Sequence, residues 1–163
     1  MDQARLVLLR HAKSSWDQPD LADHDRPLNA RGRRAGAWVG QHFREQEITF
    51  DFVLCSSAVR TMETLALLEL DGRTEVVVEG DLYGATAEEM LARLRRVTTS
   101  ASSVLLIAHN PGVHELAVML TGDREHLGSF PTAALADLRL PAGTWADLHP
   151  GATALGSFVT PSR

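Results

Sequence analysis

The chain has 163 residues, a net charge of −5 at pH 7 and a single cysteine. This length suits one domain, here residues 1–163, with a sizeable buried core. The single cysteine excludes an internal disulfide and a multi-cysteine zinc site. The acidic net charge argues against general nucleic-acid binding, which normally needs a basic face. No run approaches the roughly 18 apolar residues of a membrane span. The N-terminus lacks the features of a signal peptide, so we expect a cytoplasmic protein that has no membrane partner.

The first third of the chain predicts a strand, a loop and a helix, in that order. Residues 6–9 are wholly apolar, as expected of a strand that is buried on both faces. Residues 17–27 are polar and include two prolines, which predicts a loop. Asn29 is suited to cap the next helix, whose apolar stripe continues to about Gln46.

Further strands and helices alternate along the rest of the chain. Ser56 or Ser57 is expected to cap the second helix, and Asp71 with Gly72 to close it. The predicted strands cover residues 50–57, 75–80, 102–110, 132–140 and 154–160, and the predicted helices cover residues 58–70, 87–97 and 111–121.

The ends of the last two helices carry their own signals. Thr86 and Glu89 have the spacing of a capping box before the third helix. Pro111 suits the first turn of the fourth helix, and Gly122 is a suitable stop. This alternation indicates an α/β fold: a three-layer sandwich with a mostly parallel central sheet and helices on both faces. In such sheets, ligands bind outside the carboxyl ends of the strands.

Basic and polar side chains follow three of the predicted strands, at the point where each strand ends. We expect these side chains to meet at one edge of the sheet. They are Arg10 and His11 after the first strand, Ser56, Ser57 and Arg60 after the second, and His109 and Asn110 after the fourth.

This set of residue types is suited to phosphoryl chemistry. Arginines are planar donors for phosphate oxygens, and the first turn of the helix before Arg60 adds backbone N–H groups. A histidine is neutral for part of the time near pH 7, so His11 could attack phosphorus as a nucleophile. A second histidine, His109, could stabilise the transferring group.

Four segments together resemble the histidine phosphatase superfamily, which includes the cofactor-dependent phosphoglycerate mutases. The segment LRHAKSSWD is similar to the family's R-H-G signature, and CSSAVRTMET is similar to its second motif. The segment LLIAHNPGV resembles the late histidine motif. The segment DHDRPLNARG resembles the R-P-L-x-x-x-G run of the small SixA-type phosphohistidine phosphatases, as does the chain length. The resemblance covers residues 6–122.

The resemblance implies a role for each matching residue. His11 attacks phosphorus, Arg10 and Arg60 bind the phosphoryl oxygens, and His109 stabilises them as the second catalytic histidine. Water then releases phosphate, and neither a metal nor a cofactor is required. The implied partner is a phosphorylated protein or a small phosphoester, and the oligomeric state is open. The substrate-binding residues are expected to be Arg10, Arg60, Ser14, Asp17 and Asn110.

Two features depart from the family pattern. Ala12 stands where a glycine usually follows the histidine, which narrows the room beside the phosphate. No acidic residue stands in a convincing proton-donor motif. The carboxyl groups in the relevant interval are Glu63, Glu69, Asp71, Glu75, Glu79, Asp81, Glu88 and Glu89.

The missing proton donor favours phosphohistidine as the substrate. An alkoxide leaving group benefits from a general acid, whereas an imidazole leaves more readily from its weak P–N bond. Two rival functions stay open: a small-molecule phosphomonoesterase, and a non-catalytic module that binds phosphate or a phosphoprotein.

A cysteine phosphatase is a weaker alternative, because Cys55 and Arg60 are one residue too close for C-x5-R and the loop between them has no glycine. Arg26 is expected either to reach the phosphate or to pair with Asp25, and Glu63 either to orient Arg60 or to form a surface ion pair.

Overall fold

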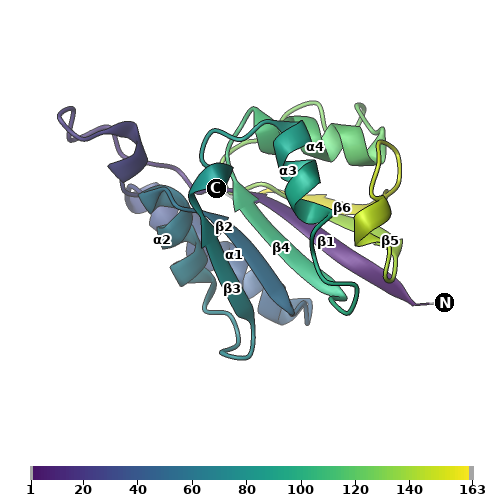
Figure 1. The fold of residues 1–163 in the computed structure, drawn as a ribbon. Coiled ribbons are helices and arrows are strands. Elements are labelled where there is room, and N and C mark those ends of the chain that lie inside the picture. Colours follow the sequence, from purple (N-terminus) through teal and green to yellow (C-terminus); the bar gives the residue numbers. More distant parts are fainter. Residues whose placement is uncertain (1, 162–163) are drawn as a thin grey trace.

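The computed structural model describes residues 2–161, which form a six-stranded sheet with helices on both faces (Figure 1). Met1, Ser162 and Arg163 of the expected domain, residues 1–163, lie outside the described residues. The strand order is β3-β2-β4-β1-β5-β6. The first four strands of that order pair in parallel, and β5 and β6 pair antiparallel. The strands are β1 (Gln3–Arg10), β2 (Phe52–Ser56), β3 (Glu75–Glu79), β4 (Ser103–Ala108), β5 (Leu135–Pro141) and β6 (Ala154–Val159).

Two helices cover each face of the sheet, which confirms the predicted three-layer α/β fold. Helices α1 (Ala30–Glu45) and α2 (Val59–Leu68) contact each other, as do α3 (Ala87–Leu94) and α4 (Gly112–Thr121). Side chains of β1 alternate between two cores: Val7 belongs to the core under α1 and α2, and Leu8 to the core under α3 and α4. The run at residues 6–9 is wholly apolar because both of its faces are buried.

The ends of α1, α3 and α4 follow the expected signals. The Asn29 side chain accepts a hydrogen bond from Gly32 N at 2.8 Å and caps α1. Thr86 and Glu89 form the predicted capping box of α3. Pro111 is the N-cap of α4 rather than its first helical residue, and Gly122 ends that helix with a positive φ of 69°.

The predicted ends of α2 are wrong. Neither Ser56 nor Ser57 caps the helix, because Ala58 is the N-cap and supplies no side-chain hydrogen bond. Ser56 instead lies against His109, with 2.7 Å between the serine Oγ and the imidazole Nε2. The helix ends at Leu68 rather than before Asp71, because Glu69 adopts a left-handed conformation with φ of 49°.

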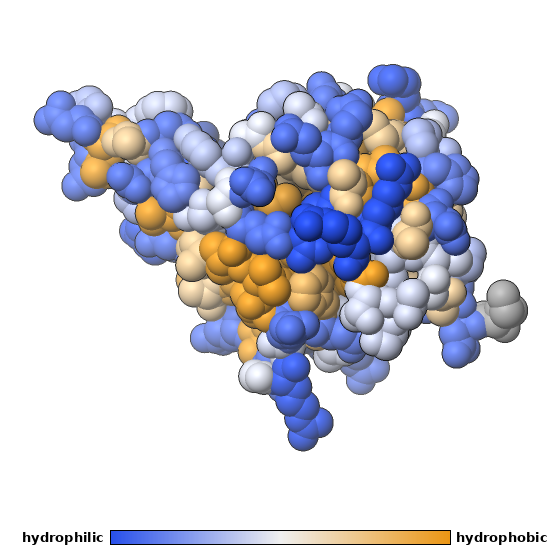
Figure 2. All heavy atoms as spheres, in the orientation of Figure 1, coloured by the Kyte–Doolittle hydropathy of each residue, from blue (hydrophilic) through white to orange (hydrophobic). Residues whose placement is uncertain are grey.

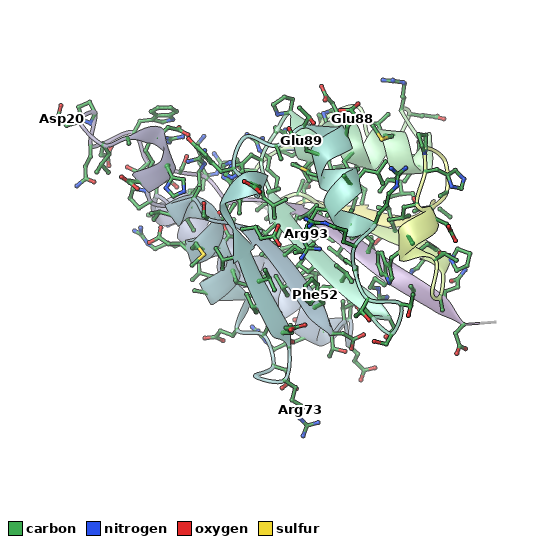
Figure 3. The ribbon with its side chains drawn as sticks, viewed as in Figure 1. Asp20, Phe52, Arg73, Glu88, Glu89 and Arg93 are labelled. Atoms are coloured by element: carbon green, nitrogen blue, oxygen red, sulfur yellow. The ribbon has the colours of Figure 1, made fainter. Side chains whose placement is uncertain are left out.

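The predicted loop at residues 17–27 is a long excursion beyond the carboxyl edge of the sheet. It projects away from the body of the molecule in Figure 1, and Asp20 lies near its tip in Figure 3. A short helix, η1 (Asp23–Asp25), brings the returning chain back towards α2. An isolated bridge between Ser14 and Leu28 closes the base of the loop.

The edge of the sheet at β3 carries an apolar patch. Figure 2 shows this patch over β2 and β3, where Phe52 and Val77 are only partly covered. Arg93 of α3 extends over the Phe52 ring at 5.9 Å and pairs with Glu79 at 2.7 Å (Figure 3). Among the described helices, none is both long and apolar enough to cross a membrane.

Gly32 allows α1 to approach the chain segment that follows His11. A Cβ added at Gly32 would lie 2.0 Å from the Lys13 carbonyl oxygen, and Lys13 O also accepts a hydrogen bond from Asn29 N at 3.0 Å. We therefore expect Gly32→Ala to lower the free energy of unfolding by about 2 kcal/mol, although alanine is the better helix former, because the backbone must move.

Urea unfolding of the Gly32→Ala variant tests this prediction. Gly72→Ala is the matched control, because a Cβ at Gly72 meets no atom within 4 Å. The control is expected to stay within about 0.5 kcal/mol of the wild type. Equal unfolding midpoints for the two variants would mean that the close approach at Lys13 does not constrain α1.

Candidate active site

The carboxyl ends of β1, β4 and β2 place the two predicted histidines side by side. Because β4 pairs with both β1 and β2, the residues after these strands are neighbours at one edge of the sheet. The imidazole rings of His11 and His109 have centroids 5.2 Å apart. Arg60, in the first turn of α2, and Arg10 both lower the pKa of His11 by their charge. The structure thus brings together the four residues expected to be catalytic: Arg10, His11, Arg60 and His109.

The His11 ring is buried and held by a main-chain contact. Its Nδ1 lies 2.7 Å from the Ala12 carbonyl oxygen, so Nδ1 carries the proton and donates to that oxygen. Burial lowers the pKa of His11 to about 4, and the charges of Arg60 and Arg10 act in the same direction. The imidazole is therefore neutral at pH 7, and the lone pair is left on Nε2.

His109 is also buried and neutral. Burial lowers its pKa to about 3, with His11 and Arg60 contributing in the same direction. Its Nε2 lies 2.7 Å from Ser56 Oγ, whereas its buried Nδ1 has no partner among the described residues. When the Ser56 hydroxyl donates to Nε2, His109 Nδ1 carries the proton, and this N–H has no acceptor among the described residues.

The two arginines present further unpaired donors at the site. The Nε atoms of Arg10 and Arg60 are buried and have no hydrogen-bond partner among the described residues. Burial and the charge of Arg60 lower the pKa of Arg10, so the two guanidinium groups repel each other at close range. An anion between them would relieve that repulsion and accept hydrogen bonds from the guanidinium groups.

Asp23 and Tyr83 join the site, although sequence reasoning did not place either there. Asp23 Oδ2 accepts a hydrogen bond from Arg60 at 3.0 Å and a second one from the Tyr83 hydroxyl. Tyr83 and the two arginines, Arg60 and Arg26, hold the pKa of Asp23 well below its usual range. Asp23 is therefore ionised and cannot donate a proton at neutral pH. The only feature of the sequence that could have pointed to Asp23 is its position three residues before Arg26.

The side chains of Arg26 and Glu63 stabilise the loop at residues 17–27 and do not bind the partners expected from the sequence. Arg26 pairs with Asp23 at 3.1 Å and not with Asp25, because the turn of η1 places residues three apart on one side. Glu63 accepts a hydrogen bond from Leu28 N at 2.7 Å and thereby anchors the end of the loop, whereas Arg60 is oriented by Asp23.

The three remaining substrate-binding candidates differ in where they lie. Ser14 is buried, and its Oγ accepts a hydrogen bond from Arg26 at 2.7 Å. Asn110 donates to the Phe130 carbonyl oxygen, which also accepts from Arg10, so Asn110 supports the segment that holds Arg10. Asp17 is exposed in the loop, and no described hydrogen bond joins its carboxylate to the four central residues.

Other expected features have structural explanations. Ala12 has a negative φ and a side chain buried in the core under α1 and α2, and its N–H donates to Thr64 Oγ1 at 3.0 Å. Cys55 is fully buried, and burial raises its pKa to about 12, so it is not a phosphatase nucleophile. No group of three or more His, Cys, Asp or Glu side chains in residues 2–161 is arranged to hold a metal ion.

The protonation of the site histidines is open to direct measurement. In long-range ¹⁵N–¹H spectra we expect the rings of His11 and His109 to stay neutral from pH 8 to about pH 5, because burial opposes their charged forms. His126 is the internal control, since its contact with Asp123 raises its pKa.

The same spectra report which ring nitrogen carries the proton. His11 is expected in the Nδ1–H form, as its contact with Ala12 requires. Spectra of His11→Asn and His109→Asn assign the signals. Titration of His11 near the ordinary value of about 6.5, or an Nε2–H form, would contradict the conclusion that the ring is neutral with its lone pair on Nε2.

Comparison with known proteins shows the family to which the chain belongs. A sequence profile of the histidine phosphatase superfamily (branch 1) matches residues 6–93. The uncharacterized protein Rv1276c of Mycobacterium tuberculosis (strain ATCC 25618 / H37Rv) is 37% identical over 162 residues, which cover 94% of this chain and 99% of that protein.

Two solved structures show the same fold over essentially the whole chain. A candidate phosphohistidine phosphatase SixA from Nakamurella multipartitia superposes with a TM-score of 0.91 at 31% identity, covering 100% of this chain and 99% of its own. Its counterpart from Agrobacterium tumefaciens superposes with a TM-score of 0.86 at 26% identity, covering 99% and 100%. A profile that spans more than half of the chain, together with SixA structures that match it from end to end, places the protein in the histidine phosphatase superfamily, in its small SixA-type branch.

Proposed function

We propose that the protein is a metal-independent phosphatase that hydrolyses phosphohistidine on a protein. The phosphoryl group passes first to His11 and then to water. The observation that carries this proposal is the state of His11: a buried, neutral imidazole that donates from Nδ1 to Ala12 and stands beside two arginines. The names of the two SixA structures that this chain resembles support the substrate class.

In the first step, the lone pair of His11 Nε2 attacks phosphorus. The bond between phosphorus and the substrate ring breaks, and its electron pair leaves with that ring, which departs as neutral imidazole because its other nitrogen carries a proton from solvent. Arg10 and Arg60 bind the phosphoryl oxygens and balance their charge, and His109 Nδ1–H donates to them. As His11 Nε2 becomes bonded to phosphorus, the ring gains positive charge, which the Ala12 carbonyl oxygen stabilises through Nδ1–H.

In the second step, water attacks the phosphorus of phospho-His11. The P–N bond breaks, the electron pair returns to His11 Nε2, and the proton of the attacking water is taken up by solvent or the released phosphate. The two arginines keep the same contacts throughout, because they are held by the protein: Arg60 by Asp23, and Arg10 by the Phe130 carbonyl oxygen. Such fixed donors stabilise the transition state without reorganising.

The carboxyl groups near the site favour an imidazole leaving group. Among residues 2–161, the one carboxylate hydrogen-bonded to a central residue is that of Asp23, which is ionised and bound to Arg60, and so cannot act as an acid. A phosphohistidine ring that carries a proton on its other nitrogen releases neutral imidazole, whose conjugate acid has a pKa of about 6.5, so it needs no acid from the enzyme. An alkoxide does need a proton, because its conjugate acid is as weak as water, with a pKa of about 15.7. Two further carboxylates in residues 2–161 already have partners: Glu79 accepts a hydrogen bond from Arg93, and Glu89 accepts one from Thr86 N.

Phosphate release from a phosphohistidine protein and from p-nitrophenyl phosphate, both in EDTA, tests the proposal. We expect turnover of both substrates in EDTA, with a higher kcat/KM for the phosphohistidine protein. A higher kcat/KM for sugar phosphates would favour the phosphomonoesterase alternative. Tight binding of the phosphoprotein without any turnover, unchanged in a His11→Ala variant, would favour a non-catalytic binding module.

A further inference from the structure

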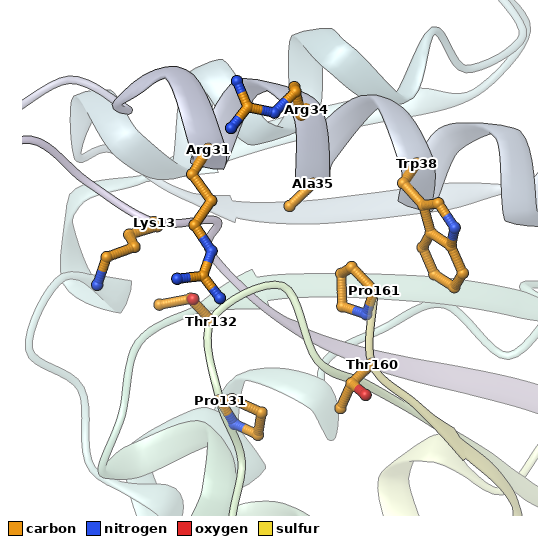
Figure 4. A pocket seen from close by; sticks show the side chains of 9 residues that line it. All are labelled: Lys13, Arg31, Arg34, Ala35, Trp38, Pro131, Thr132, Thr160 and Pro161. Carbon is orange, nitrogen blue, oxygen red and sulfur yellow. The ribbon is translucent and has the colours of Figure 1, made fainter. Parts of the chain in front are cut away.

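A basic cavity lies beside the site, on the side of the sheet covered by α1. It has a volume of about 600 Å³ and opens between the N-terminal half of α1 and two chain segments near the C-terminal strands (Figure 4). In the close-up, Arg31 extends from α1 towards Thr132, and Trp38 forms the wall further along the helix. The lining residues are Lys13, Arg31, Arg34, Ala35, Trp38, Pro131, Thr132, Thr160 and Pro161.

The charge of this cavity has one sign. Lys13, Arg31 and Arg34 are exposed, and none of their side chains makes a hydrogen bond or ion pair with another described residue. Among the described residues that line the cavity there is neither Asp nor Glu, although the whole chain carries a net charge of −5. Lys13 is also the only lysine in the chain. Three unpaired cations around one cavity attract an anionic ligand.

The position of two of these arginines is unfavourable for the helix itself. The N-terminus of a helix carries partial positive charge, so the first turn normally favours acidic residues. The first turn of α1, residues 30–33, contains no acidic residue; Arg31 stands in it and Arg34 directly follows it. Arg33, between them, donates to the Leu28 carbonyl oxygen, whereas the other two line the cavity. A carboxylate bound in the cavity would meet both the two guanidinium groups and the positive helix end.

The cavity is next to the catalytic edge along the chain and in space. Lys13 follows His11 by two residues, and Gly32 of α1 packs against the Lys13 backbone. On the other wall, Thr132 precedes Ala133, whose N–H donates to the carbonyl oxygens of Arg10 and His11. A polypeptide that presents phosphohistidine to His11 can therefore continue between these walls, whereas a small phosphoester ends at the site.

We propose that this cavity is the docking groove for an acidic segment of the phosphoprotein substrate. Carboxylates beside the phosphorylated histidine bind Lys13, Arg31 and Arg34, and Trp38 and the two prolines contact the apolar parts of the segment. The inference rests on the proposed function, because it assigns to a protein substrate the contacts outside its phosphoryl group. The groove thus sets which phosphoproteins are hydrolysed fastest, and has no part in the chemical step.

Two synthetic phosphohistidine peptides that differ only in their flanks, one with glutamate and one with glutamine, test the groove. At low salt we expect the wild type to have a kcat/KM about tenfold higher for the glutamate peptide, mainly through KM, and this preference should fade as salt is added. The double variant Arg31→Glu/Arg34→Glu should lose the preference and favour a third peptide with lysine flanks. Hydrolysis of p-nitrophenyl phosphate should not change.

Arg73→Glu/Arg96→Glu is the matched control. Both arginines are exposed and lie outside the cavity, and Arg73 extends away from the body of the molecule in Figure 3, so the change in net charge is identical. Glutamate in the first turn of α1 favours the helix, so the test variant is expected to fold. The control should keep the wild-type preference for the glutamate peptide.

The outcomes separate this proposal from the proposed function. Equal hydrolysis of all three peptides by the wild type would overturn the groove alone, because the phosphohistidine would still be cleaved. No hydrolysis of any peptide, with p-nitrophenyl phosphate still cleaved, would overturn the proposed function and the groove with it. An equal loss of both peptide and p-nitrophenyl phosphate hydrolysis in Arg31→Glu/Arg34→Glu would mean that these cations serve the phosphate site itself.

Discussion

Replacing His11 with alanine is expected to lower kcat/KM by at least about 10³-fold, because the variant has no atom to accept the phosphoryl group. The arginines and His109 remain, so the variant should still bind phosphate analogues such as vanadate. The fold should survive, since the lost contact is a single hydrogen bond from the ring to the Ala12 carbonyl oxygen.

An acid-labile ³²P label on the enzyme provides a second measurement of phosphoryl transfer to His11. With ³²P-labelled substrate and rapid quenching, the wild type should carry label that is stable in base and lost in acid, as a phosphohistidine is. The His11→Ala variant should carry none. His126→Ala is the control, because His126 is exposed and bonded to Asp123 outside the site. Label on His11→Ala, or turnover within tenfold of the wild type, would assign the nucleophile to another residue.

Replacing Arg60 with alanine is expected to lower kcat/KM by about 10²- to 10³-fold, as is found when a preorganised donor to the transition state is removed. Its guanidinium is almost fully buried, holds a free Nε, and is fixed by two hydrogen bonds to Asp23. Arg60→Lys should recover only part of the loss, because lysine restores the charge but not the planar fork of donors.

The variant Asp23→Asn distinguishes a contact of Arg60 with phosphate from the contact of Arg60 with the loop at residues 17–27. This variant keeps Arg60 but removes the carboxylate that Arg60, Arg26 and Tyr83 share. If Arg60 acts on the phosphoryl group, Asp23→Asn should lose far less activity than Arg60→Ala. Steady-state kinetics and urea unfolding of both variants decide the question. Equal losses in kcat/KM would mean that Arg60 serves mainly to hold η1.

Local patterns explain why so much of the site could be predicted. The run at residues 6–9 has to be buried on both faces, so Arg10 and His11 have to emerge at the strand end. The same reasoning places His109 after β4. In a parallel sheet these ends meet at one edge, and the rings of His11 and His109 do so.

The predictions that failed concern side chains whose expected partner is nearby in the sequence but whose actual partner is a different group. Ser56 has the composition of a helix cap, but its hydroxyl contacts His109, 53 residues away. Arg26 has Asp25 beside it in the sequence, but the turn of η1 gives it Asp23. Glu63 was considered as a partner of Arg60 one helical turn away, yet it binds the backbone of Leu28. A residue that is close in the sequence is not favoured as a hydrogen-bond partner when a loop brings other groups equally near.

The sequence by itself determined the α/β fold, the edge of the sheet that carries the candidate site, and the four residues that meet there: Arg10, His11, Arg60 and His109. Each of these follows from periodicity, caps and strand ends, which are encoded within a few consecutive residues. Only the tertiary structure decided that Asp23 binds both Arg60 and Tyr83, and that Lys13, Arg31 and Thr132 line one cavity. These contacts join segments up to about 120 residues apart, and they depend on how loops cross the edge of the sheet, which no local pattern specifies.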